Sequence, residues 1–274
     1  MWLPSLHDSY RAGVRIKPRV LILEIRDKNN PKGEPIGWVM TERDEKYSLE
    51  ASSQCVDEAM IRLAYQRVSS NPNIASYEHG EFCGYYSKAR NIVSITSGSL
   101  SGGYVSIEEL HDLKGQRIGT YLMNEIIQWA KQWPAAAVKT IRLDAGQATS
   151  DNTVRRNRFY EQFGIEFDFE DDQGRVGQSR PMQAHSLQLV DKWQKNITEY
   201  HLIPYLRDIL RKLELTNMAL DRSERALKYQ LAEREAAERS PVQWLVRQIM
   251  TRYLSVLIAC GLIIVIAITV WFKI

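Results

Sequence analysis

The stretch LHDLKGQRIGTYLMNEIIQWAKQW, Leu110–Trp133, decides the fold of this chain. A strand is predicted to end at its first residue. A short turn with Gly115 then leads into an amphipathic helix over about residues 116–133, which Pro134 ends. The first N–H groups of a helix lack intrahelical acceptors and carry the positive end of its dipole. Glycine lets a phosphate approach the backbone closely. The turn therefore predicts a pyrophosphate site, although it is neither a P-loop nor a dinucleotide fingerprint.

The residues around this stretch predict an α/β domain over residues 1–185. Aliphatic residues predict a strand at Arg19–Ile25, and the turn cluster Asn29–Pro35 joins it to a hairpin partner at Ile36–Met40. Apolar residues at helical spacing predict a helix over Val56–Val68. Further strands are predicted around Gly84–Tyr86, Asn91–Ile95, Tyr104–Leu110, Lys139–Ala145 and Ile165–Phe169, with a helix from Asn152 to Gly164 before the last of them.

Two of these segments together resemble the GCN5-related N-acetyltransferase family. That family carries an R/Q-x-x-G-x-G/A loop before its central helix, and residues 114–119 here read KGQRIG. Its next helix carries an asparagine, a tyrosine and then a glycine, as does the segment DNTVRRNRFYEQFGIEF, Asp151–Phe167. The resemblance covers about Val105–Phe169 and implies a mixed, mostly antiparallel central sheet flanked by helices. The matching residues of the second segment are Asn152 or Asn157, Tyr160 and Gly164.

By this resemblance the cofactor is acetyl-coenzyme A. Its pyrophosphate would rest on the backbone N–H groups of the loop, and a strand amide near Leu110 would polarise the acetyl carbonyl. Arg117 stands where the family usually has its first loop glycine, and Lys114 replaces the usual Arg or Gln, so both keep positive charge at the anion site. The implied cofactor-binding residues are Leu110, Lys114, Gly115, Gln116, Arg117, Ile118, Gly119, Thr120, Asn152 and Asn157.

The resemblance also implies the catalytic residues. A substrate amine would attack the thioester carbonyl directly, which requires alignment, stabilisation of the oxyanion and removal of one proton. Tyr160 occupies the family's position for protonating the departing thiolate, and a core tyrosine is the alternative. The base is Glu108 or Glu109, of which only one can face the cleft, because successive strand residues face opposite sides. A solvent-facing pair is the alternative, and His111 is a second candidate for the base.

The C-terminal run LSVLIACGLIIVIAITVWF, Leu254–Phe272, holds 19 residues without a charge. Because a bilayer core needs about 20 apolar residues as a helix, a transmembrane helix is predicted. Arg247 and Arg252 precede the run and Lys273 alone follows it. This predicts a single-pass anchor in a lipid bilayer with the head in the cytoplasm. The three cysteines form no paired framework, which fits a reducing compartment.

A helical stalk is predicted over residues 186–239, where leucines and Asn217 fall on the a and d positions of a heptad repeat. The e positions are charged and the g positions are not. The stalk is either a two-stranded parallel coiled coil that pairs two chains as a homodimer, or an amphipathic helix packed on the head. Ser240 and Pro241 predict the start of an interfacial amphipathic helix over residues 240–253, and a continuation of the stalk is the alternative.

The composition gives no sign of a nucleic-acid-binding protein or of a metal site. The net charge of +3 is too small to indicate nucleic acid by itself, and no Cys/His spacing predicts a metal site. The resemblance implies an N-acetyltransferase that acetylates an amine on a small molecule or a protein, and the C-terminal run predicts that it is tethered to a membrane. The alternatives are a catalytically inactive binding or scaffolding head with the same fold, and a toxin-like member that acetylates tRNA.

Overall fold

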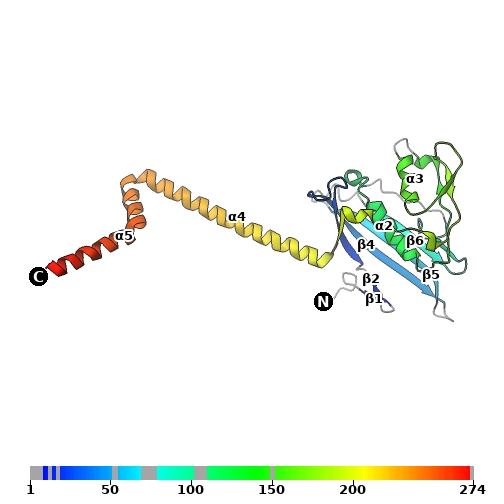
Figure 1. Ribbon diagram of the computed structural model, residues 1–274, viewed down its shortest axis with the longest axis horizontal. Helices are drawn as coiled ribbons and strands as arrows, with labels where there is room; N and C mark the ends of the chain where they lie inside the picture. The colour runs from blue at the N-terminus through cyan, green and yellow to red at the C-terminus, as the bar shows by residue number, and fades with distance from the viewer. Residues whose placement is uncertain are drawn as a thin grey trace. The chain divides into compact units, whose positions relative to one another are not determined.

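The computed structural model describes residues 9–11, 14–16, 19–50, 55–68, 79–101, 110–148 and 152–271 (Figure 1). The chain divides into two compact units, Met1–Leu206 and Arg207–Ile274. The first unit contains all the strands and the candidate site, and the second is helical. Each unit is therefore described by itself.

Seven strands form the main sheet of the first unit, in the order β12-β3-β4-β5-β6-β7-β8. Neighbours pair antiparallel except β7 and β8, which are parallel. A parallel pair needs a crossover connection, and helix α2 (Ile118–Ala130) lies in this one. A separate hairpin pairs β1 (Ser9–Arg11) with β2 (Val14–Ile16). The strands of the main sheet are β3 (Val20–Arg26), β4 (Pro35–Leu49), β5 (Val56–Val68), β6 (His79–Ser87), β7 (Ile92–Ser94), β8 (Ala137–Val138) and β12 (Ile197–His201).

The hairpin of β3 and β4 confirms the prediction for this region. Five consecutive residues of β3 are buried, as expected for an aliphatic strand covered on both faces. The register pairs Arg26 with Pro35, and the turn between them is closed by hydrogen bonds from Gly33 N to Asn30 O and from Asn30 N to Asp27 O. The strands around Gly84 and Ile92 are confirmed as well, as β6 and β7.

The predicted helix over Val56–Val68 is wrong, because this segment is strand β5, paired with β4 on one side and β6 on the other. Met60, Leu63 and Ala64 do recur at helical spacing, but the buried side chains alternate along the segment. A pleated strand places every second residue on the same face. Backbone hydrogen bonds to two neighbouring strands favour the two-residue repeat of a strand over the 3.6-residue repeat of a helix. The alternating buried residues are Ala59, Ile61, Leu63 and Tyr65.

Helix α2 confirms the predicted amphipathic helix and covers the sheet over β5 and β6 (Figure 1). Of its 13 residues, only Gln128 is not buried. Helix and sheet lie close together at Gly84 of β6, where an added Cβ would stand 3.0 Å from Trp129 Cζ3 and 3.0 Å from Ile61 Cγ2. The absence of a side chain at this position therefore lets the helix lie close to the sheet.

Replacing Gly84 by alanine is expected to lower the free energy of unfolding by about 1–3 kcal/mol, because the added methyl group forces Trp129 and Ile61 apart. Urea denaturation followed by tryptophan fluorescence measures the change. Gly146→Ala is the matched control, since no described atom lies within 4 Å of a Cβ there. Equal destabilisation by both substitutions would contradict the close contact at Gly84.

A smaller sheet has the order β10-β11-β9, with both pairs antiparallel. Its strands are β9 (Arg142–Leu143), β10 (Phe167–Phe169) and β11 (Gly177–Ser179). Helix α3 (Thr153–Glu161) connects β9 to β10, and Gly164 follows it with φ +79°, as predicted for a glycine just past a helix. The predicted strand over Ile165–Phe169 is confirmed by β10. The one over Lys139–Ala145 is confirmed only in part, because Ala145 already begins a 3-10 helix.

The sheet unit extends beyond the predicted domain end at residue 185. Strand β12 pairs with β3, and Leu202 begins helix α4 (Leu202–Arg239) directly after His201 ends β12. Residues 186–201 therefore belong with the sheet rather than with a helical stalk. Helix α5 (Pro241–Trp271) begins at the predicted proline and includes the segment predicted as an interfacial helix. Of the predicted strand over Tyr104–Leu110, only Leu110 lies within the described residues.

The prediction of a C-terminal transmembrane helix over Leu254–Phe272 is wrong. Within the ranges given above, no helix combines the length and the apolar character that crossing a bilayer requires. The prediction rests on a count of uncharged residues alone. The predicted localisation, a single-pass membrane anchor with a cytoplasmic head, fails with it.

Candidate functional site

The bend before α2 has an unusual backbone. Gly115 has φ +79°, and Arg117, the N-cap residue of α2, has φ 68° and ψ 13°. Glycine adopts this left-handed region freely, whereas a residue with a Cβ is disfavoured there by about 1–2 kcal/mol. Strained residues of this kind cluster at functional sites. The strain at Arg117 therefore marks the predicted loop as a candidate site.

The first turn of α2 presents backbone N–H groups to which the described part of the chain offers no acceptor. Among the described residues, none accepts a hydrogen bond from the backbone N–H groups of residues 117–120. The first hydrogen bond of the helix runs from Tyr121 N to Arg117 O at 3.0 Å. Ile118, Gly119 and Thr120 are buried, and buried N–H groups are nearly always paired. Four amides without acceptors at the positive end of a helix dipole fit an anion such as a diphosphate.

Positive side chains lie beside this turn. A Cβ on Gly115 would stand 3.5 Å from Lys28 Nζ, and both Lys28 and Lys114 are exposed. The backbone N–H of Lys28 donates to Gln116 Oε1 at 2.8 Å, which ties the β3–β4 turn to the bend. Sequence analysis missed Lys28, because 88 residues separate it from Gln116 and no local pattern links them.

The Arg117 side chain turns to another part of the unit. Its Nη1 donates to Lys192 O and to Asn196 Oδ1, both at 3.0 Å. Asn196 is buried, and its Nδ2 donates to Gln116 O and to Arg26 O, also at 3.0 Å. These bonds hold Arg117 in its strained conformation and commit its guanidinium to protein acceptors. What residue 117 offers a ligand is therefore its backbone N–H.

A hydrogen bond links the end of helix α3 to the same turn. Gln162 Nε2, just beyond the end of α3, donates to Thr120 Oγ1 at 3.2 Å. Tyr160 of α3 is 6% exposed and meets the rings of Phe159 and Phe167 edge-on. Burial raises the pKa of Tyr160 to about 12, so its hydroxyl keeps its proton at neutral pH. The structure thus brings the segment that carries Tyr160 to the predicted loop.

Three of the other predicted site residues, Leu110, Asn152 and Asn157, lie within the described residues, and two do not. Leu110 is fully buried, and Asn152 is the N-cap residue of α3, where its Oδ1 accepts a hydrogen bond from Arg155 at 2.7 Å. Asn157 Nδ2 donates to Gly174 O at 2.9 Å in the β10–β11 turn. Glu108 and Glu109, the predicted bases, lie outside the described residues.

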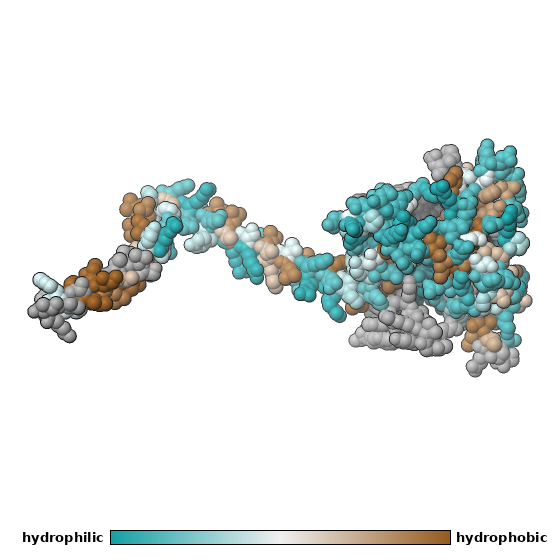
Figure 2. All heavy atoms as spheres, viewed as in Figure 1, coloured by the Kyte–Doolittle hydropathy of each residue, from teal (hydrophilic) through white to brown (hydrophobic). Residues whose placement is uncertain are grey.

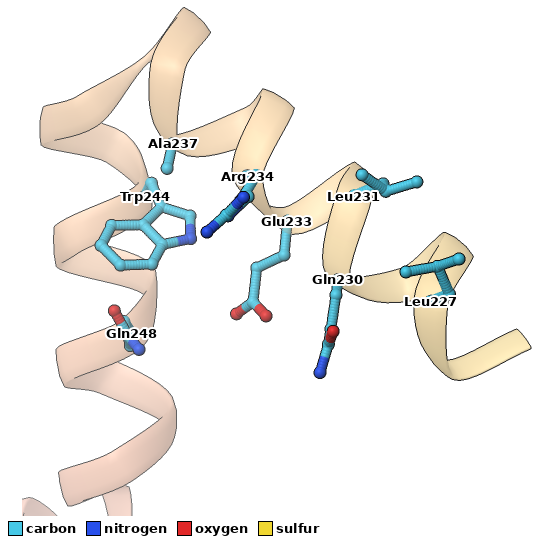
Figure 3. Close-up of a pocket in the computed structure, with 8 residues that line it drawn as sticks. All are labelled: Leu227, Gln230, Leu231, Glu233, Arg234, Ala237, Trp244 and Gln248. Atoms are coloured by element: carbon cyan, nitrogen blue, oxygen red, sulfur yellow. The ribbon is translucent and has the colours of Figure 1, made fainter. Parts of the chain in front are cut away.

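The second unit contains an open groove at the junction of α4 and α5 (Figure 3). In this view Trp244 of α5 lies opposite Arg234 of α4, with Gln248 and Glu233 below them. The lining is otherwise made of leucine, alanine and glutamine side chains, which offer neither a nucleophile nor a metal-ligand set. The groove is therefore a weaker candidate for chemistry than the bend before α2.

Among the described residues, no group of three His, Cys, Asp or Glu side chains is placed to hold a metal ion. No protein-family model matches the chain, and no curated protein matches it at a significant level. The candidate site therefore stands on its geometry: four amides without described acceptors, two flanking lysines, and an adjacent helix that carries a protonated tyrosine.

Proposed function

We propose that the first unit is an N-acetyltransferase that takes the acetyl group from acetyl-coenzyme A. The observation that carries the proposal is the set of backbone N–H groups of residues 117–120, which have no acceptor among the described residues. The diphosphate of coenzyme A is an anion of the right kind for a helix N-terminus. The succession of β9, α3, β10 and β11 after α2, together with the sequence resemblance, supports this cofactor over other anions.

In this proposal each part of the site has one task. The amides of the first turn bind the diphosphate, and Lys28 and Lys114 attract the rest of the charged cofactor. The amine of the acceptor attacks the thioester carbon, the carbon–sulfur bond breaks, and the departing thiolate takes a proton. Tyr160 supplies that proton from its neutral hydroxyl, and the proton that the acetylated nitrogen loses then restores the hydroxyl. The acceptor is an amine on a small molecule or a protein.

The rival proposal is a binding or scaffolding head that uses the same fold without catalysis. The protein contacts of the Arg117 side chain favour it, because they occupy a group that could otherwise reach a phosphate. The two proposals differ in one measurement, the release of free thiol when the protein, acetyl-coenzyme A and a panel of amines are mixed. A binding head takes up the cofactor and releases no thiol.

Charge reversal at the flanking lysines tests the cofactor site. The full chain carrying Lys28→Glu and Lys114→Glu is expected to bind acetyl-coenzyme A about tenfold more weakly than the wild type, because two attractive charges become repulsive. Isothermal titration calorimetry measures the dissociation constant. Lys46→Glu is the matched control, since Lys46 is exposed and lies far along β4 from the β3–β4 turn.

Two results would overturn the assignment. If acetyl-coenzyme A does not bind the wild-type chain, the anion site is not a coenzyme A site. If the Lys46 variant loses affinity as much as the double variant does, binding depends on net charge and not on the bend before α2.

A further inference from the structure

Helix α4 presents a long apolar stripe that no described residue buries. It runs without interruption over 38 residues, Leu202–Arg239, and none of them is buried. Its leucines are about half exposed, and Figure 2 shows hydrophobic side chains recurring along the helix between polar ones. A helix stabilised only by its own backbone bonds is marginal, so a helix of this kind gains most of its stability from a partner.

The stripe repeats every seven residues. Leu206, Leu213, Leu220 and Leu227 occupy four successive d positions and are 44%, 55%, 57% and 56% exposed. Leu210 and Leu231 occupy a positions and are 59% and 51% exposed. A repeat of 3.5 residues per turn, rather than 3.6, is typical of a seam between supercoiled helices. The stripe therefore fits another helix with the same repeat.

We propose that α4 pairs in parallel and in register with α4 of a second copy of this chain. Asn217 occupies the a position in the middle of the stripe. An asparagine there is satisfied by its own counterpart, and the two meet only when the helices run parallel and in register. A buried asparagine at a single a position favours two strands over three or four.

The charges beside the seam favour the same orientation. In the parallel pair, each charged e position faces an uncharged g position of the partner helix. In a fully overlapping antiparallel pair, e positions face e positions, which would bring Arg207 beside Lys228 and Glu214 beside Asp221. Like charges at these distances disfavour that arrangement. The uncharged g positions are Ile209, Thr216, Ser223 and Gln230.

The pair carries one defect, Glu224, which also occupies an a position. Two carboxylates would meet there across the seam, and each would lose part of its hydration. Replacing Glu224 should therefore strengthen the pairing, whereas a charge placed at a leucine of the seam should weaken it. Glu224→Leu is expected to tighten the pairing by about tenfold or more, because it replaces two facing charges by apolar side chains.

Sedimentation velocity of the full chain over a range of concentrations tests the proposal. A density-matched nonionic detergent covers the exposed apolar side chains of α5, such as Leu262 and Ile264. The wild type is expected to sediment as a dimer, and a variant with Leu213→Glu and Leu220→Glu as a monomer. Leu215→Glu is the matched control, because Leu215 is 58% exposed and lies outside the seam.

The orientation has its own test. In a variant with Asn217→Cys, mild oxidation is expected to join the two copies by a disulfide between the introduced cysteines. Arg222→Cys, on the outer face of the helix, is the control that does not cross-link. A monomeric wild type, or equal dissociation of the Leu215 variant and the double variant, would overturn the proposal. A dimer that fails to cross-link at residue 217 would overturn the parallel register.

Discussion

The substitution Arg43→Ala is expected to lower the free energy of unfolding by about 3–5 kcal/mol. Arg43 of β4 lies between two carboxylates: its Nε donates to Glu45 Oε1 and its Nη1 to Glu125 Oε2, each at 2.6 Å. The side chain of Glu125 is only 6% exposed, and that of Glu45 16%. Burial alone would lower the pKa of Arg43, yet the two carboxylates raise it overall. Removing the cation takes the shared partner from two carboxylates that are largely shielded from solvent.

Two controls separate this effect from a general loss of packing. Arg19→Ala breaks ion pairs to Glu42 and Asp44, but Arg19 and Glu42 are nearly half exposed, so the change is expected to stay within about 1 kcal/mol. Arg43→Met combined with Glu125→Leu is expected to recover part of the loss, because it also removes Glu125, the more deeply buried of the two carboxylates. Urea denaturation measures all three variants. Equal losses for Arg19→Ala and Arg43→Ala would contradict the buried network.

Tyr160→Phe is expected to lower kcat about 100-fold while leaving the affinity for acetyl-coenzyme A unchanged. This result rests on the proposed function, in which the Tyr160 hydroxyl protonates the thiolate. Phenylalanine keeps the edge-on contacts with Phe159 and Phe167 and removes only the proton donor. Tyr86→Phe is the matched control, since Tyr86 and Tyr160 are both 6% exposed. Unchanged turnover in the Tyr160 variant would show that Tyr160 is a core residue without a catalytic role.

The same variant has a consequence at high pH. Burial raises the pKa of Tyr160 from 10.0 to about 12, so the folded state favours the neutral phenol. This contribution to stability is fully present below pH 10 and is lost as the pH rises through about 12. Between these two values, the wild type is expected to lose roughly 2 kcal/mol more stability than Tyr160→Phe. Urea denaturation at a series of alkaline pH values measures the difference, and parallel curves would contradict it.

The sequence predicted the elements that local patterns determine. Helix α2 follows from its amphipathic spacing and from Pro134, and the β3–β4 hairpin follows from aliphatic strands around a polar turn. Strand β5 was misread because Met60, Leu63 and Ala64 satisfy the helical repeat, while the alternation that decides its state depends on β4 and β6. Pairing between distant segments overrides a local period.

The candidate site likewise contains some residues that local motifs predict and others that only the folded chain brings together. The bend with Gly115 and the helix with Tyr160 could be predicted, because each lies in a continuous motif. Lys28 and Asn196 could not be predicted. They bond to Gln116 across 88 and 80 residues of sequence, respectively, and neither belongs to a motif that links it to the bend. The transmembrane prediction for the apolar C-terminal run failed, because it rested on a count of uncharged residues alone.

The direct passage from β12 into α4 has a mechanical consequence. A tension applied to α4 enters the sheet at His201, because no loop lies between them to absorb it. The edge strand then has five register pairs with β3 to resist the load, from His201 and Leu21 at one end to Ile197 and Ile25 at the other. Asn196, whose side chain bonds to the bend before α2, follows the last of these pairs. The applied force would therefore reach it only after all five pairs had separated.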